Sequence, residues 1–215
     1  LDVRDLSISF TSDHRELKVV DHVSLHLDEA ETLAVVGESG SGKTVTALAV
    51  LRLIPTPQGK ISTGEIFFRD GESQPTDILK LEERDMQKLR GRAISMIFQE
   101  PMTSLNPVFT CGDQVMESLR IHLGFSKKQA REKVLDLFNE VKLPLPSSVF
   151  NSYSHQLSGG QKQRVMIAMA IACNPAILIA DEPTTALDVT VQKTILGLMK
   201  SLQESRNMSI LFITH

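Results

Sequence analysis

At 215 residues the chain is long enough for one sizeable hydrophobic core, or for one domain that carries an inserted subdomain. Its apolar content of 41% and charged content of 23% are ordinary for a globular protein. A net charge of −3 gives no electrostatic argument for binding nucleic acid or an anionic membrane surface.

The first part of the chain reads as β-strands. Apolar residues alternate roughly with polar ones over 3–10 and again over 23–27, as in half-buried strands. The segment 32–36 is continuously apolar and ends at Gly37, which predicts a central strand of a parallel sheet.

Helical and extended patterns then alternate. Residues 43–53 have a helical pattern, and Pro55 and Pro57 end it. Further along we expect a strand, a polar loop, a helix and a strand that leads to Gln99, over 61–68, 70–76, 79–89 and 94–98.

The middle of the chain has a different character. Loop residues such as Pro101 and Asn106 are followed by amphipathic helices over 114–122 and 126–141. We interpret residues about 100–165 as a helical subdomain inserted into a domain that spans residues 1–215.

The last part returns to alternation. We expect a helix, a buried strand, a helix and a final strand over 161–173, 177–180, 191–205 and 210–213. Strands that alternate with helices predict an α/β fold with a mostly parallel central sheet and crossover connections. Because His215 follows directly after a strand, we expect the C-terminal part of the domain to be missing from this sequence.

The cysteines and the apolar runs point to no metal site and no membrane span. Cys111 and Cys173 are far apart and lack metal-type spacing, which favours buried thiols in a reducing compartment. No N-terminal stretch resembles a signal peptide. The longest apolar run, 165–173, is far below the roughly 20 residues that a membrane helix needs. Any membrane role therefore comes through a partner.

The clearest motif is a phosphate-binding loop, Gly37-Glu38-Ser39-Gly40-Ser41-Gly42-Lys43-Thr44. It lies between an expected strand and an expected helix, which is the position of a phosphate loop. The alternative is a glycine-rich turn with an exposed lysine, which would not need a strand before it and a helix after it. Glycines let backbone N–H groups turn toward a phosphate, and the start of the helix adds its positive dipole end. We expect Lys43 to neutralise phosphate oxygens and Thr44 to offer its hydroxyl to Mg²⁺.

Two adjacent carboxylates follow the expected strand 177–180. We predict that this strand lies beside the strand that leads to the phosphate loop. Asp181 would then hold Mg²⁺, directly or through water, and Glu182 could orient or deprotonate an attacking water. A solvated acidic turn before Pro183 is the simpler alternative, but two neighbouring carboxylates at a buried strand end are costly without a cation nearby.

A second glycine-rich segment, Leu157-Ser158-Gly159-Gly160-Gln161, precedes an expected helix. By itself a Ser-Gly-Gly sequence is usually a helix cap with an anion site. Followed by Lys162-Gln163-Arg164 and then by the Asp-Glu strand end, it resembles the signature of the ATP-binding cassette (ABC) family. The resemblance covers essentially the whole chain.

The resemblance implies further roles, residue by residue. Gln99 fits the glutamine that touches Mg²⁺ or water and couples to a membrane partner. Thr185-Ala186-Leu187-Asp188 fits the loop that crosses a dimer interface, with Asp188 in contact across it. His215 fits the switch histidine near the γ-phosphate, which would act in catalysis with Glu182. Residues 157–161 would close the ATP site of a second cassette.

The adenine contact departs from the family pattern. Family members often stack adenine on an aromatic residue of the N-terminal strands, and the only tyrosine, Tyr153, lies elsewhere. His14 is nearest to the expected position, and an exposed loop histidine explains it equally well.

The run from Phe98 to Pro107, Phe-Gln-Glu-Pro-Met-Thr-Ser-Leu-Asn-Pro, resembles the importer branch that handles peptides, glutathione and nickel. The resemblance implies an ATPase with ATP and Mg²⁺ as ligands. It implies a second cassette and two transmembrane permease subunits as partners, with a solute-binding protein acting indirectly and no nucleic acid. The chain would lie on the cytoplasmic face of the inner membrane as a peripheral subunit.

Two other functions are alternatives to an importer ATPase. A soluble cassette ATPase that acts on ribosomes or nucleic acid would usually carry a basic stripe, a coiled-coil insertion or a linker between cassettes, and none is visible. A phosphate-loop kinase would leave residues 157–161 unexplained. We expect the importer motor.

Overall fold

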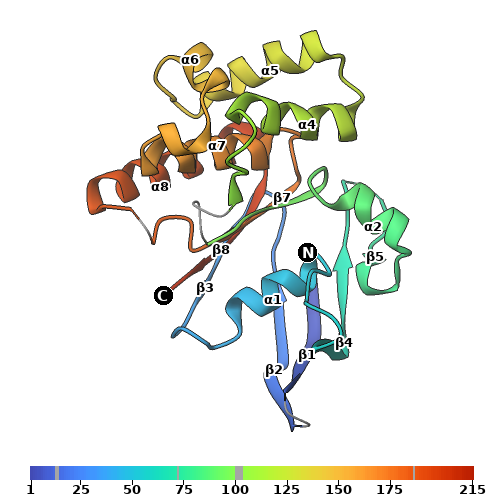
Figure 1. Ribbon diagram of the computed structural model, residues 1–215. Coiled ribbons are helices and arrows are strands. Elements are labelled where there is room, and N and C mark those ends of the chain that lie inside the picture. Colours follow the sequence, from blue (N-terminus) through green and yellow to red (C-terminus); the bar gives the residue numbers. More distant parts are fainter. Residues whose placement is uncertain (13–14, 72, 100–103, 186) are drawn as a thin grey trace.

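The computed structural model describes residues 1–12, 15–71, 73–99, 104–185 and 187–215. His14, Pro101 and Ala186, which the sequence analysis discussed, therefore lie outside the described residues, as does most of the loop directly after Gln99. The described strands form two four-stranded sheets, one antiparallel and one parallel (Figure 1).

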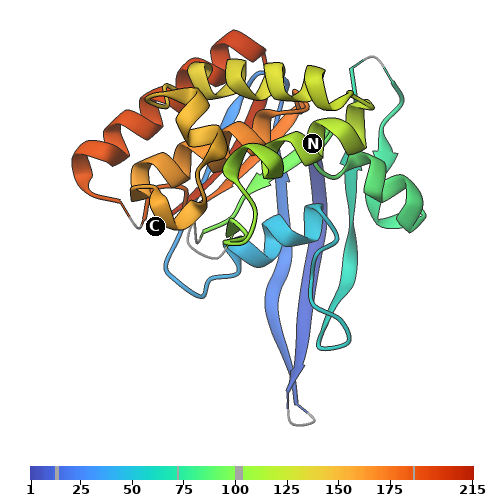
Figure 2. The ribbon, with the colours of Figure 1, turned by 45° about the horizontal axis from the view of Figure 1, so that its top comes forward.

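The antiparallel sheet has the order β2-β1-β4-β5. Its strands are β1 (Asp2–Ser12), β2 (Arg15–His26), β4 (Gly59–Phe68) and β5 (Thr76–Asp77). β1 pairs with β2 on one side and with β4 on the other. Its alternating apolar residues Val3, Leu6 and Ile8 are buried in the core. The β1–β2 hairpin extends beyond the rest of the molecule in both ribbon views (Figure 2).

The parallel sheet has the order β3-β8-β7-β6. Its strands are β3 (Thr32–Val36), β6 (Ile94–Ile97), β7 (Ile177–Asp181) and β8 (Ser209–Thr214). All five residues of β7 are buried, as its apolar sequence predicts for an inner parallel strand. The parallel alignment brings the carboxyl ends of all four strands to one edge.

Two predictions about this sheet were wrong. β3 is the edge strand of the described sheet, and its residues alternate between exposed and half-buried. β7 does not lie beside β3, because β8 pairs with both and separates them. A continuous apolar run has the same appearance at an edge and at the centre, and strand order depends on pairings distant in sequence.

Helices cover the two faces of the parallel sheet. On one face, Ile177 and Ile179 of β7 share a core with α1 (Lys43–Val50) and the antiparallel sheet. On the other face, Leu178 and Ala180 share a core with the remaining long helices. The alternation along one strand thus divides the protein into two cores.

The remaining helices are largely those that the sequence predicts. They are α2 (Glu83–Leu89), α4 (Cys111–Leu123), α5 (Lys127–Glu140), α7 (Gly159–Ile171) and α8 (Val189–Arg206). Their starts follow ordinary capping rules, since Thr110, Ser126, Ser158 and Asp188 each accept a backbone N–H bond at the N-terminus of one helix.

Short elements differ from the prediction. The helix expected over 79–89 is split into a 3₁₀ turn, η1 (Ile78–Lys80), and α2, because Asp77 caps the first turn and Leu81 is extended. The expected polar loop 70–76 ends in the short strand β5. α6 (Pro146–Asn151) and the 3₁₀ turn η2 (Ser154–Gln156) were not predicted, since such short helices carry little periodicity.

Two glycines provide a matched test of the packing. A Cβ on Gly112, at the start of α4, would lie 2.4 Å from the ring of Phe150 in α6, whereas one on Gly197 in α8 would meet nothing within 4 Å. We expect Gly112→Ala to lower the stability by roughly 1–3 kcal/mol through overpacking. Gly197→Ala should raise it by roughly 0.8–1 kcal/mol through helix propensity. Thermal denaturation of both variants tests this, and a stabilised Gly112→Ala variant would contradict the packing.

Candidate nucleotide site

The phosphate loop connects β3 to α1 and needs glycine at its turns. Gly40 and Gly42 have φ angles of 82° and 89°, which side chains disfavour. A Cβ on Gly42 would also lie 2.8 Å from the carbonyl oxygen of Val19 in β2. The antiparallel sheet therefore packs closely against the loop and supports it from one side.

Lys43 folds back over this loop. Its Nζ donates to the carbonyl oxygens of Gly37 at 2.6 Å and Glu38 at 2.8 Å, and only 9% of the residue is exposed. Lys43 forms no ion pair with any carboxylate in the part of the chain that the structure describes. Its ammonium is thus held by neutral oxygens, an arrangement that leaves the charge available to an anion.

Thr44 and Asp181 meet although their strands are not neighbours. The Thr44 hydroxyl donates to Oδ1 of Asp181 at 3.1 Å, because α1 crosses the sheet from β3 and packs against β7. Asp181 is 1% exposed, and burial raises the pKa of its carboxyl above 3.8, with a smaller contribution from the charge of Glu182. A hydroxyl and a buried carboxylate in contact are suitable ligands for Mg²⁺.

Glu182 is the centre of a hydrogen-bonded group. Its Oε2 accepts from Nε2 of Gln99 at 2.9 Å and from Oγ1 of Thr185 at 3.0 Å, and Nδ1 of His215 lies 3.5 Å away. Glu182 adopts a φ of 45°, unusual for a residue with a side chain, and its N–H donates to the carbonyl of Ile213 in β8. Three strand ends therefore bring their polar residues to one carboxylate oxygen.

Thr185 was not predicted to act at this carboxylate. The family resemblance placed it in a loop at a dimer interface, whereas the structure places its hydroxyl on Glu182 within the same chain. The signal in the sequence is its position three residues after Glu182 in a turn that starts with Pro183, and such local contacts are typical of threonine.

The signature segment lies elsewhere. Ser158 caps α7 by accepting from N–H of Gln161 at 3.3 Å, and the Gln161 side chain accepts from N–H of Ser158 in return. α7 packs on the opposite face of the sheet from α1, and the described residues show no hydrogen bond between 157–161 and the phosphate loop. The phosphate loop and the signature are thus two separate glycine-rich segments, each at the start of a helix.

The signature contacts the start of α8. A Cβ on Gly159 would lie 3.4 Å from Leu187, and one on Gly160 would lie 3.0 Å from Val191. Asp188 is occupied as the N-cap of α8, where its Oδ1 accepts from N–H of Val191 at 3.0 Å. The two glycines therefore allow α7 to begin directly against α8.

Phe10 is an aromatic residue of the N-terminal strands. Phe10 of β1 pairs across the hairpin with Leu17 of β2, which is 67% exposed, and β2 continues to Val19 beside Gly42. The alternating pattern over 3–10 predicts a half-buried strand, and the ring of Phe10 is partly buried against the core, where it would lie 2.8 Å from a Cβ on Gly59. Tyr153 lies next to the signature segment, where its ring stacks on His155.

The two cysteines are buried, as the sequence predicts. Cys111 and Cys173 are buried free thiols, and burial raises the pKa of Cys111 to about 11. Within the described ranges, no cluster of three or more His, Cys, Asp and Glu side chains could hold a metal ion. No helix there is both long and apolar enough to cross a membrane.

A phosphate loop between a parallel strand and a helix, with the hydroxyl of Thr44 in that helix on the carboxylate of Asp181 at the end of β7, defines a phosphate-loop nucleotide-binding protein. A family model described as ABC transporter matches residues 20–185. The chain belongs to the ABC transporter family.

Curated relatives match the chain over its whole length. It is 50% identical over 215 residues to the glutathione import ATP-binding protein GsiA of Salmonella typhimurium, and covers 34% of that protein. It is 51% identical to the oligopeptide transport ATP-binding protein OppD of Bacillus subtilis, and covers 59% of it. The chain thus spans about a third of the length of the Salmonella relative.

A solved structure supports the same fold. The ATP-binding cassette MJ0796, in a dimeric post-hydrolysis state bound to ADP and Pi, superimposes with a TM-score of 0.86 and 28% sequence identity. The match covers 100% of this chain and 87% of that one. The predicted fold class, a phosphate-loop α/β domain with an N-terminal antiparallel sheet, is confirmed.

The buried carboxylate leads to a stability prediction. Because the folded state raises the pKa of Asp181, it binds the proton more tightly than the unfolded state, and stability is lost as the pH rises through and above 3.8. We expect Asp181→Asn to raise the Tm of the nucleotide-free protein by a few degrees at pH 7, and less at pH 4; for this size, 1 kcal/mol shifts Tm by roughly 2–4 °C. It should also abolish the further stabilisation by ATP and Mg²⁺.

Thermal denaturation with and without nucleotide measures both effects. The exposed Asp136→Asn in α5 is the matched control and should change neither. A lower Tm for Asp181→Asn without nucleotide would show that the ionised carboxylate stabilises the empty protein.

Proposed function

We propose that this chain is the ATP-hydrolysing motor of a bacterial importer of peptides, glutathione or a similar small solute. The observation that carries the proposal is the convergence of Gln99, Thr185 and His215 on Glu182, next to the Thr44–Asp181 pair. The names of the curated relatives support import rather than action on ribosomes or nucleic acid.

ATP would bind with its phosphates over the loop 37–44. The loop N–H groups and the start of α1 would surround the β-phosphate, and Lys43 would exchange its carbonyl contacts for phosphate oxygens. Mg²⁺, held by Thr44 and by Asp181 with Gln99 nearby, would neutralise charge on the β- and γ-phosphates. The cation would also offset the cost of burying the Asp181 carboxylate.

Glu182 would act as the general base toward the attacking water. Its Oε2 is fixed by donors from three separate elements, so its position does not depend on the nucleotide. Gln99 would orient the water, and His215, 57% exposed in its side chain, could turn toward the γ-phosphate.

The adenine would lie against the β1–β2 hairpin. Phe10 and the exposed Leu17 are paired on the strands that reach the phosphate loop, and together they offer an apolar surface to a base.

A second cassette would complete the site. Residues 157–161 form an N-terminal helix site that serves no group of its own phosphate loop, since the two lie on helices of opposite faces. In a pair of cassettes the signature of each would contact the γ-phosphate held by the other, and Asp188 would lie at the interface. The MJ0796 cassette, dimeric with ADP and Pi, supports this arrangement.

Two transmembrane permease subunits would be the further partners, at the cytoplasmic face of the inner membrane, with a solute-binding protein acting through them. Val108 and Phe109, between Gln99 and α4, are 70% and 53% exposed. Thr110 forms a bridge to Tyr153, which is 39% exposed, so these apolar side chains share one surface. Such exposed aromatic residues suit a protein contact.

The first test separates binding from hydrolysis. We expect Glu182→Gln to keep ATP affinity but to lower steady-state hydrolysis in the assembled transporter by roughly 10²–10⁴-fold, since the base is lost. Phosphate release and ATP binding are measured on the same sample. Turnover close to that of the parent protein would refute the role of Glu182.

The second test addresses the phosphate loop. Lys43→Ala removes a charge-assisted contact worth roughly 1.5–3 kcal/mol, and should weaken ATP binding by roughly ten- to a hundredfold. Lys128→Ala, on the exposed side of α5, is the matched control and should leave the affinity unchanged. Equal ATP affinity in both variants would overturn the assignment of the loop.

A further inference from the structure

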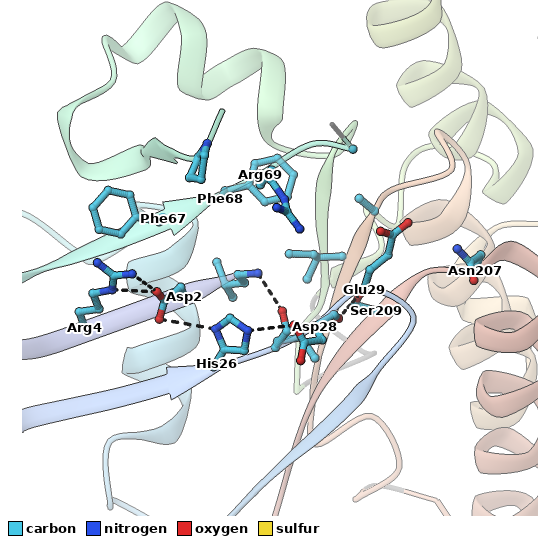
Figure 3. A pocket seen from close by; sticks show the side chains of 16 residues that line it. Asp2, Arg4, His26, Asp28, Glu29, Phe67, Phe68, Arg69, Asn207 and Ser209 are labelled. Carbon is cyan, nitrogen blue, oxygen red and sulfur yellow. Dashed lines mark hydrogen bonds and ion pairs between the residues drawn. The ribbon is translucent and has the colours of Figure 1, made fainter. Parts of the chain in front are cut away.

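A cavity of about 480 Å³ lies at the opposite edge of the parallel sheet from the phosphate loop (Figure 3). It is lined from both sheets, by the ends of β2 and β4 and by the amino ends of β7 and β8. None of the residues of the candidate nucleotide site lines it. Its volume is in the range of sites that bind small molecules.

One wall of the cavity is fixed by ion pairs. Arg4 contacts Asp2 at 2.6 Å, and His26 lies 3.7 Å from Asp2 and 3.0 Å from Asp28. The carbonyl of Asp28 accepts from the Ser209 hydroxyl at 2.8 Å, which ties this wall to β8. These groups satisfy one another, so the wall is formed without a ligand (Figure 3).

Two charged residues that line the cavity, Arg69 and Glu29, take no part in these ion pairs. Arg69 follows β4 and Glu29 lies in the turn before β3, so they come from different walls (Figure 3). Neither has a hydrogen bond or ion pair with another side chain in the described ranges. Both side chains are solvent-exposed. The lining also has the polar residues Asn207 and Ser209, and its apolar part consists of the half-buried Phe67 and the buried Leu27, Phe68 and Ile177.

We propose that this cavity binds a short peptide with free termini and apolar side chains. The carboxylate of the ligand would pair with Arg69, which offers planar donors that match it. The ammonium group would pair with Glu29, and the side chains would cover the apolar lining. A ligand that lacks either charge would leave one of the two residues unpaired.

The site gives the proposed motor a means of regulation, and this part rests on the proposed function. A peptide bound between the two sheets would contact both β4, which belongs to the sheet that supports the phosphate loop, and β7, which ends at Asp181. Imported peptide could thus adjust the rate of hydrolysis from the cytoplasmic side.

Calorimetric titration of the full-length protein with the dipeptide Leu-Leu tests the site. We expect saturable binding of Leu-Leu, and none of N-acetyl-Leu-Leu-amide, which has the same side chains without the terminal charges. Arg69→Gln and Glu29→Gln should each weaken binding roughly tenfold or more. The exposed Arg84→Gln in α2 and Glu132→Gln in α5 are the matched controls and should bind as the parent does.

Lys43→Ala separates this site from the nucleotide site, since it should lose ATP affinity and keep Leu-Leu affinity. The proposal is overturned if the full-length protein does not bind Leu-Leu, if the capped dipeptide binds equally well, or if the two pocket variants bind as the controls do. A loss of ATP hydrolysis in Glu182→Gln has no bearing on these titrations, so the two proposals fail separately.

Discussion

The parallel alignment of four strands is the constraint on which the site depends. β3, β8, β7 and β6 run in one direction, so the residues that follow them, Gly37, His215, Glu182 and Gln99, collect at one edge. This edge is where ligands bind in open α/β sheets, because the loops there are free to carry polar residues while the strands stay buried. These four residues are far apart along the chain, and the sheet brings them together.

Electrostatics then determine what this edge can bind. Asp181 is buried beside the carboxylate of Glu182, and burial raises the pKa of Asp181. The folded protein therefore favours the protonated form of this carboxyl group. Lys43 lies close enough to oppose this shift but is hydrogen bonded to carbonyls, not to the acid. A buried acid and a cation that do not neutralise each other form a site prepared for a cation and an anion together.

Local rules in the sequence predicted most of this arrangement. The helical spacing of apolar residues, the glycines of the phosphate loop and the apolar strand 177–180 predicted the helices, the loop and the strand because each pattern acts over a few residues. The order of the strands could not be obtained this way: β8 lies between β3 and β7, yet it comes last in the chain. For the same reason the contact of Thr44 with Asp181, 137 positions apart, was expected only through a metal.

Residues 181–185 and 187–188 link Glu182 to the signature in the proposed mechanism. Glu182 accepts from Thr185, and two residues later Leu187 lies against Gly159 of the signature, while Asp188 begins α8. Gln192 of α8 donates to the carbonyls of Thr184 and Leu187, which holds the segment between the strand and the helix. We propose that a change in what the signature contacts would reach Glu182 through these few contacting residues. A Cβ on Gly160 would lie only 3.0 Å from Val191, so the start of α7 packs closely against the start of α8.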